Sequence, residues 1–360
     1  MNKTPENAVV LPNEQERRQV FCWLRQVSSW TAWNRILGYY KSWTDVTEAS
    51  IKEASKKGWE NRTGIPDSDY RLILKGLAHF DEGVRRLRTG DKRVFKYDAN
   101  GEFVMAERPE DHWSSMLWRL DLGESEIDYD RTPHWIEFKR TLTELNQAWG
   151  ECSPEIIESG DLHAPTHTFF NEYLKAKLEK MTFPTPLSEV PIPTEIELVR
   201  SGKPIPCSGI WEPVHVPKPK GFSMFRESPT PQLPLQIVGT MAYLHGGSHA
   251  PNMAAYGEAD GLPTTWLLLW KDDRYADGSI PAEEAGYVFL MPEPPAAVAS
   301  PQERSPELRL VYADTGEPAP QGGRWLVEHD IHASIDLQKG EPLPRHHGES
   351  VRWVLADTWR

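Results

Sequence analysis

The sequence lacks the features that mark membrane and secreted proteins. Nothing in its 360 residues approaches the roughly 18 consecutive apolar residues of a membrane-spanning helix. The N-terminal residues, Met1 to Asn7, lack the apolar core of a signal peptide. The three cysteines, Cys22, Cys152 and Cys207, are widely spaced and odd in number, which favours reduced thiols over a disulfide framework. These absences predict a cytoplasmic protein.

The chain also lacks an excess of basic residues. It carries 53 Asp and Glu against 40 Lys and Arg, a net charge of −13. A nucleic-acid binder needs a basic footprint, and anionic membranes attract basic segments. The charge therefore argues against direct binding to nucleic acid or membrane. It is compatible with a basic protein partner, which an acidic surface would attract.

Familiar catalytic motifs are missing as well. The sequence contains no G-x-S-x-G, no H-E-x-x-H and no phosphate-binding glycine loop. His245 and His249 could share a metal ion if they stood four apart on a helix, but two glycines between them favour a turn. We therefore expect no catalytic residue, no cofactor and no metal. The rival interpretation is a metal-dependent enzyme or binding protein that uses His245 and His249.

A repeated pattern without reactive groups is the main positive feature. Two stretches read G-x-P-x-P-x-x-G-x-W, and a partial third copy follows at 340–344. The prolines hold an extended backbone, the second glycine permits a turn or bulge, and the tryptophan begins a strand and buries a large ring. We expect both tryptophans to be core anchors; an exposed proline-rich ligand is the alternative. The repeated residues are Gly202, Pro204, Pro206, Gly209, Trp211, Gly316, Pro318, Pro320, Gly323 and Trp325.

Proline divides the chain into two parts. Residues 1–183 hold seven prolines, whereas residues 184–360 hold twenty-four. We predict an α+β protein with an all-α N-terminal domain at 1–183. A proline-rich linker or lead-in strand follows at 184–206. The β-rich domain at 207–360 carries the repeats and is mostly antiparallel, of barrel or sandwich type.

Apolar spacing places the elements within these two parts. Helical periodicity predicts helices at about 14–43, 44–58, 68–90, 109–120, 132–149 and 165–181. The Asn100-Gly101 pair between two apolar runs predicts one small β-hairpin near 93–106. In the second part, short apolar runs predict strands at 235–238, 241–244, 265–270, 287–291, 308–312, 325–327 and 351–355.

Two groups of acidic residues are candidates for contacts with a basic partner. One is a loop between two predicted helices, where five acids occur in ten residues without a base. The other follows a predicted strand, in a string that does not fit a calcium loop and favours a polar hairpin. A solvated loop is the ordinary outcome for such runs. The candidates are Asp121, Glu124, Glu126, Asp128, Asp130, Asp272 and Asp273.

The layout resembles the bacterial immunity proteins of polymorphic-toxin and type VI secretion systems, in particular the related families numbered seventy-one and seventy-two. The resemblance rests on a Trp-rich helical part and on three strings of the second part: PCSGIWEP at 206–213, WKDDRY at 270–275 and GEPAP at 316–320. It implies a two-domain inhibitor, made beside its toxin, that has no catalytic residues and neutralises the toxin by binding.

Further expectations follow from that resemblance. A cytoplasmic inhibitor should meet a cytosol-acting toxin, which favours a nuclease with a basic substrate face. An acidic and aromatic interface could cover such a face. An adaptor or chaperone that loads an effector into a secretion machine is an alternative. A homodimer stays open because the chain has 15 tryptophans.

Overall fold

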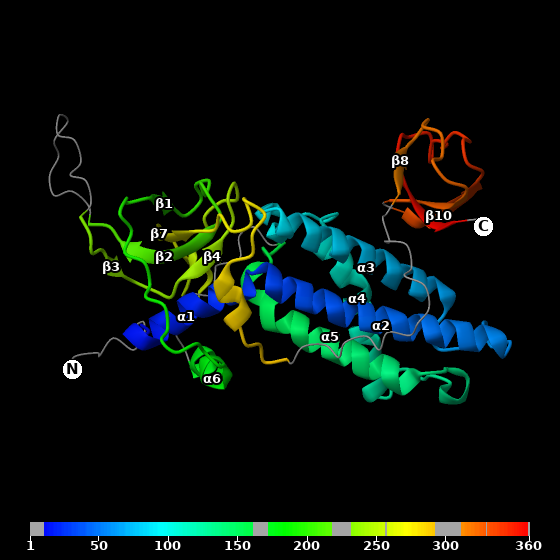
Figure 1. Ribbon diagram of the computed structural model, residues 1–360, viewed down its shortest axis with the longest axis horizontal. Helices are drawn as coiled ribbons and strands as arrows, with labels where there is room; N and C mark the ends of the chain where they lie inside the picture. Colours follow the sequence, from blue (N-terminus) through cyan, green and yellow to red (C-terminus); the bar gives the residue numbers. More distant parts are fainter. Residues whose placement is uncertain are drawn as a thin grey trace. The chain divides into compact units, whose positions relative to one another are not determined.

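The computed structural model describes residues 11–160, 172–217, 232–255, 258–291, 311–328 and 330–358. Its helices lie mainly in the first half of the chain and its antiparallel sheets in the second half (Figure 1), which confirms the predicted α+β class. Two compact units result. Unit 1 contains Met1–Trp43, Asp81–Met105 and Lys139–Pro294, and unit 2 contains Thr44–Phe80, Ala106–Phe138 and Pro295–Arg360.

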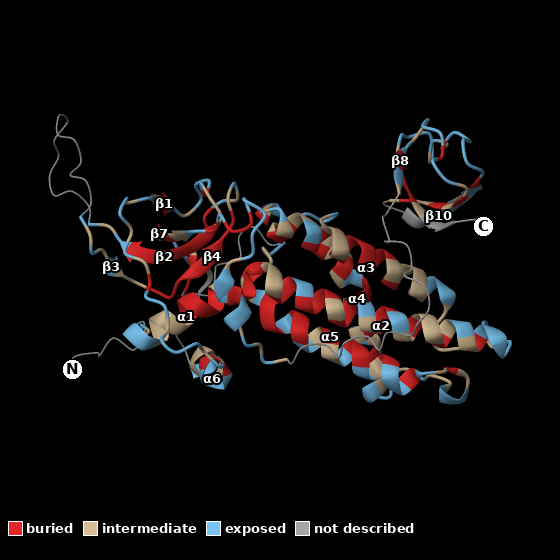
Figure 2. Cartoon of the chain, viewed as in Figure 1, coloured by how far each residue is buried: buried red, intermediate tan, exposed pale blue. Residues whose placement is uncertain are grey.

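Amphipathic sequences form the helices, whose buried stripes are visible in Figure 2. Within the described ranges, no helix is both long enough and apolar enough to cross a membrane. The α-helices are α1 (Glu14–Val27), α2 (Trp30–Lys56), α3 (Asp67–Arg88), α4 (Glu102–Asp121), α5 (Trp135–Ile156) and α6 (Glu172–Lys180); the short 3₁₀ helices are η1 (Lys92–Phe95), η2 (Tyr129–Arg131) and η3 (Ala282–Gly286).

Two serines interrupt the first predicted helix. The Ser28 hydroxyl donates to the Leu24 carbonyl (2.7 Å) where α1 ends, and the Ser29 hydroxyl accepts from the Ala32 amide (3.1 Å) where α2 begins. Serine side chains bond to nearby backbone groups and so favour helix ends. The predicted boundary at Thr44 is wrong, because α2 continues through it.

The predicted hairpin near 93–106 is also wrong. The chain forms η1 and then enters α4, with only a turn between them, in which Gly101 donates to the Asp98 carbonyl (2.8 Å). Phe95 and Phe103 are fully buried, and Phe103 stacks on Trp33 with ring centroids 4.5 Å apart. Burial of these aromatic rings among helices outweighs the local preference of the Asn-Gly pair for a hairpin.

The strands form two separate open sheets and one hairpin. Unit 1 has a five-stranded sheet of order β1-β7-β2-β3, in which β4 also pairs with β2, and unit 2 has a four-stranded sheet of order β10-β9-β11-β8. Strands β5 and β6 pair with each other. The strands are β1 (Leu198–Arg200), β2 (Gly209–His215), β3 (Gln236–Ile237), β4 (Ala242–Leu244), β5 (Met253–Ala255), β6 (Glu258–Leu262), β7 (Thr265–Lys271), β8 (Tyr312–Asp314), β9 (Gly323–Val327), β10 (Asp330–Leu337) and β11 (Arg352–Thr358).

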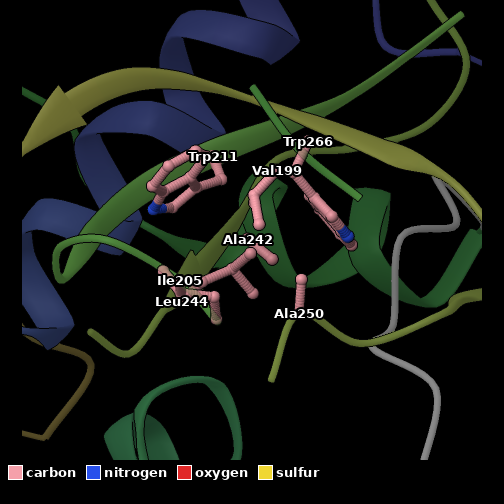
Figure 3. Packing of buried hydrophobic residues seen from close by; sticks show 7 residues of the cluster. All are labelled: Val199, Ile205, Trp211, Ala242, Leu244, Ala250 and Trp266. Atoms are coloured by element: carbon pink, nitrogen blue, oxygen red, sulfur yellow. The ribbon is translucent and has the colours of Figure 1, made fainter. Parts of the chain in front are cut away.

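Each of the two larger sheets has a hydrophobic core of its own. The core in unit 1 contains Trp211 and Trp266, which Figure 3 shows with Val199 beside them. The core in unit 2 contains Trp325 and Trp353. Both repeat tryptophans, Trp211 and Trp325, are 0% exposed, so the repeated pattern supplies one core anchor to each sheet.

Candidate protein interface

The acidic loop, residues 121–130, begins at a well-formed helix end in unit 2. Gly123 adopts a positive φ of 72°, its amide donates to Leu120, and the Glu124 amide donates to the Arg119 carbonyl (2.9 Å). These bonds are the Schellman pattern, which satisfies the last carbonyls of α4. The sequence -Leu-Gly-Glu- therefore fixes the direction in which the loop leaves the helix.

The far end of the acidic loop is also fixed. The Asp128 side chain accepts from the Arg131 amide (3.2 Å) and caps η2, and its carbonyl accepts from the Thr132 hydroxyl (2.7 Å). That hydroxyl in turn accepts from the Gly64 amide (2.8 Å). A Cβ on Gly64 would lie only 2.1 Å from the Ile127 side chain, so glycine is needed there for close packing. Asp128 is thus a structural cap.

Four of the five acids in this loop are exposed: Asp121, Glu124, Glu126 and Asp130. They contribute to a marked difference between the units. Unit 2 holds 25 Asp and Glu against 16 Lys and Arg, net −9, whereas unit 1 holds 28 against 24, net −4. The negative charge is therefore concentrated in the smaller unit, where an approaching basic surface would be attracted.

Large apolar side chains are exposed around the acidic loop. Trp118 is 65% exposed, Leu122 53%, Tyr129 63% and Ile136 79%. The Tyr129 ring makes an edge contact with the buried Trp135, with centroids 6.2 Å apart, which holds it in place at the surface. Exposed aromatic residues near a charged rim are characteristic of binding surfaces.

Asp272, the second acidic candidate, lies in a different environment. Its side chain is 0% exposed, and it accepts from the Arg274 guanidinium (2.7 and 2.8 Å) and the Tyr243 hydroxyl (2.9 Å). Lys92 Nζ lies 3.4 Å away. Arg274 also donates to the Ser28 hydroxyl (2.7 Å), so this buried group joins β7 to the end of α1. Asp272 is therefore a structural residue, unable to meet a partner while the protein is folded.

The buried group also includes Glu284, which lies 3.8 Å from Arg274, so two carboxylates face the two cations Arg274 and Lys92. Burial raises the pKa of Asp272, but Arg274, with smaller contributions from Lys92 and Tyr243, more than offsets burial and holds the pKa below its usual range. Burial lowers the pKa of Lys92 to about 8, although Asp272 opposes the shift. Asp273, in contrast, is 60% exposed and lies 3.4 Å from Lys271. Of the two neighbours, only Asp273 remains at the surface.

The two candidate histidines are separated by the turn between them. His245 is buried, and burial lowers its pKa to about 4. His249 is exposed and lies opposite Pro204 in an isolated bridge. Gly247, at a φ of 82°, forms the turn that parts them. Nowhere among the described residues do three or more His, Cys, Asp or Glu side chains gather in a way that could hold a metal ion.

Comparison with known families agrees with the layout of the chain. Residues 11–167 match the model of the family immunity protein 71, and residues 191–288 match that of immunity protein 72. The resemblance to immunity proteins is confirmed. No curated protein matches the chain, and neither does any solved structure. The acidic loop lies inside the immunity protein 71 match, the five-stranded sheet lies inside the immunity protein 72 match, and residues 289–360 lie outside both.

The exposed apolar residues are the part of this surface that sequence reasoning missed. Trp118 and Ile136 lie in amphipathic helices. A single apolar residue outside the buried stripe is common in such helices, so the sequence does not mark these two as part of a binding surface. Tyr129 lies within the acidic run, and an aromatic ring flanked by Asp128 and Asp130 was the one signal available. The immunity-protein resemblance implies a toxin partner, and an acidic surface with exposed rings can bind a protein.

Proposed function

We propose that this chain is a cytosolic immunity protein that binds and neutralises a cognate toxin, with a nuclease as the toxin class. In this proposal the chain has no catalytic activity of its own. The observation that carries the proposal is the acidic loop with its exposed rings, within the part that matches immunity protein 71. The concentration of negative charge in unit 2 supports it.

The charge and the rings have different roles in the proposed complex. A nuclease carries a basic face for its phosphate-rich substrate, and the carboxylates of Glu124, Glu126 and Asp130 would attract that face. Such attraction mainly raises the association rate. Burial of Trp118 and Tyr129 against the toxin would slow dissociation, since buried aromatic residues dominate interface energies. Inhibition then follows from covering the substrate face.

Co-expression tests the proposal directly. The wild-type chain should restore growth of cells that express the toxin encoded beside it, and the purified proteins should form a complex. Tyr129→Ala should weaken the complex by about tenfold or more, because it removes a large exposed ring from the interface. Tyr173→Ala is the matched control: Tyr173 is 76% exposed but lies on α6 in unit 1, and its loss should leave affinity unchanged.

A second variant separates charge from ring burial. Glu124→Lys combined with Glu126→Lys should slow association and weaken its dependence on salt, while dissociation changes little. Asp128 is left intact because it caps η2. Failure of the wild-type chain to bind or to rescue would contradict the proposed function. Delivery of an active toxin in the complex would support the adaptor alternative instead.

A further inference from the structure

The same β fold occurs twice in this chain. The first β module, residues 198–271, is built on β1, β2, β4 and β7, with β3 and the β5–β6 hairpin as additions. The second β module, residues 312–358, contains β8, β9, β10 and β11. The strand order is β1-β7-β2-β4 in the first module and β8-β11-β9-β10 in the second, and all neighbours are antiparallel. Small sheets often share a strand order, so the residue register is the stronger comparison.

The register matches strand by strand. In both modules the repeat tryptophan lies opposite a leucine. In both, the strand opposite the tryptophan then has one extra, bulged residue before the next pair. The bulged residues are Leu269 and Ala356. The first module pairs Val199–Trp266, Trp211–Leu268, Ile210–Trp270 and Gly209–Leu244, and the second pairs Ala313–Trp353, Trp325–Leu355, Arg324–Asp357 and Gly323–Leu337. Strand order does not dictate the place of a bulge, so a shared one indicates a common plan.

A cluster of hydrogen bonds closes both modules in the same way. The Pro251 carbonyl accepts from the Trp266 indole (2.9 Å) and from the Ser201 hydroxyl (2.9 Å). The same hydroxyl accepts from the Thr264 amide (2.9 Å). The three bonds recur in the second module between Pro344, Trp353, Thr315 and Val351, at 3.0, 3.2 and 2.9 Å.

The partial third copy of the repeat is explained by this duplication. Residues 316–319 form one arm of an antiparallel pair, and residues 340–343 form the other, with Pro318 opposite Pro342. The matching arms of the first module meet where Pro204 lies opposite His249. The string at 340–344 is therefore the return arm of the second module. The matched glycines at positive φ are Gly202 and Gly316, Gly247 and Gly340, and Gly261 and Gly348.

The two modules differ on the face opposite the tryptophan core. In the first module this face is buried against helices: Ile210 is 0% exposed, Glu212 binds Arg17 of α1 (2.8 Å), and Trp270 makes an edge contact with Phe21 (6.4 Å). The buried pair Ile210–Tyr243 has Arg324–Asp336 as its counterpart in register. That second pair is an ion pair, with side chains 37% and 48% exposed.

The two sequence ranges also differ in the sign of their net charge. Residues 198–271 hold six Lys and Arg against four Asp and Glu, whereas residues 312–358 hold four against eight. The change is clearest at the turn that precedes the first arm, where Arg200 and Lys203 correspond to Asp314 and Glu317. On the return arm, Glu341 stands where the first module has a serine. At these matched turn positions the first module is basic and the second acidic, whereas both cores contain the repeat tryptophan.

We infer that the chain contains a duplicated β module, and that the second copy presents its paired arms as an additional contact surface for a basic toxin. This inference rests on the proposed function. Glu317 and Glu341 lie on adjacent arms, since the amide of Leu343 donates to the Glu317 carbonyl (2.9 Å) and the amide of Ala319 to that of Glu341 (2.8 Å). Both side chains are exposed, and each also accepts a hydrogen bond from a backbone amide of its own turn: Glu317 from Asp314 (2.8 Å) and Glu341 from Gln338 (2.6 Å). The occupant is identified by charge complementarity.

The duplication itself supplies the test variants. Glu317→Lys installs the residue that the first module carries at the same place in the same turn, whose backbone conformation therefore accommodates lysine. The change also removes the bond from the Asp314 amide to the Glu317 carboxylate (2.8 Å), so folding of the variant is checked separately. In the full chain it should weaken toxin binding by about tenfold, mainly through slower association. Glu341→Ser, the other first-module residue, should weaken it less because it removes one charge instead of reversing it. Hydrogen exchange across 312–358 confirms that both variants remain folded.

Two controls make the test specific. Lys203→Glu alters the matching turn of the first module, and Glu172→Lys makes the same charge change at a side chain that is 93% exposed in unit 1. Both should bind as the wild type does. Wild-type affinity of folded Glu317→Lys and Glu341→Ser overturns the inference, as does equal weakening by Glu172→Lys. If the wild-type chain does not bind the toxin at all, it is the proposed function that fails.

Discussion

The two β modules have one fold but different surroundings. Behind the tryptophan core, the first module has apolar residues and a buried group centred on Asp272 and Arg274, and helices cover this face. At the matching place the second module has an exposed ion pair, Arg324–Asp336. The second module is still partly covered, since Val354 is 2% exposed and Lys75 of α3 donates to the Glu328 carbonyl (3.0 Å). The comparison teaches that the two modules share core and register, whereas the residues outside the core decide how far helices bury each module.

Loss of the repeat tryptophan should show this difference most strongly. Trp211→Ala and Trp325→Ala each remove a ring that is 0% exposed, at a cost of about 3–5 kcal/mol. Because helices pack on the first module, Trp211→Ala should raise hydrogen exchange in residues 198–271 and in α1 together. Trp325→Ala should raise it in residues 312–358 and in the part of α3 near Lys75, and should leave α1 unchanged. Spread of fast exchange from Trp325→Ala into α1 would show that the second module is not independent.

A pair of arginine variants compares the two ion pairs. Arg274→Met leaves the buried Asp272 without its main partner and should lower the free energy of unfolding of unit 1 by about 3–5 kcal/mol. Arg324→Met in the second module breaks an exposed pair and should change stability little. Urea unfolding monitored by hydrogen exchange measures both. Similar losses for the two variants would contradict the assigned difference in burial.

Much of the fold could be predicted because its signals are local. The helical stripes, the proline shift and the repeat tryptophans all depend on short-range periodicity. The strand predicted at 287–291 is wrong, because the backbone there bonds to helix side chains and not to a neighbouring strand. Gln26 donates to the Val288 carbonyl (2.8 Å), and the Leu290 amide donates to Glu151 (2.8 Å). Strand β10 was missed because alternating polar residues break its apolar run. Long-range contacts decided both cases.

The candidate site was only partly predictable. The acidic loop was found by counting charges, but burial of Asp272 depends on Arg274 and on Ser28, far away in sequence. Sequence spacing alone places Asp272 and Asp273 together, although one is buried and the other exposed. The duplication was visible only as the short repeat, because matching positions outside it, such as Tyr243 and Asp336, share register and not chemistry.

A pH experiment sharpens the comparison at a matched position, since His245 corresponds to Gln338. Burial lowers the pKa of His245 to about 4, below the 6.5 of the unfolded chain. The unfolded state then binds more protons between these values, so acidification from pH 6.5 to 4 should cost unit 1 up to about 3 kcal/mol. His245→Gln should remove this part of the acid sensitivity. If the melting temperatures of the wild type and of His245→Gln fall by the same amount between pH 7 and pH 5, the assignment is contradicted.

Glycine variants give the smallest expected effect and test whether the duplicated turns are equivalent. Gly202 and Gly316 adopt φ values of 76° and 90°, and a Cβ on either would meet no atom within 4 Å. Alanine therefore adds backbone strain alone, of about 1–2 kcal/mol at each site. Equal losses, measured by hydrogen exchange in the respective module, would show that the two turns are interchangeable. A much larger loss for Gly202→Ala would mean that the turn of the first module cannot relax around the new side chain. Helix packing against the first module would then have made it more rigid than the second.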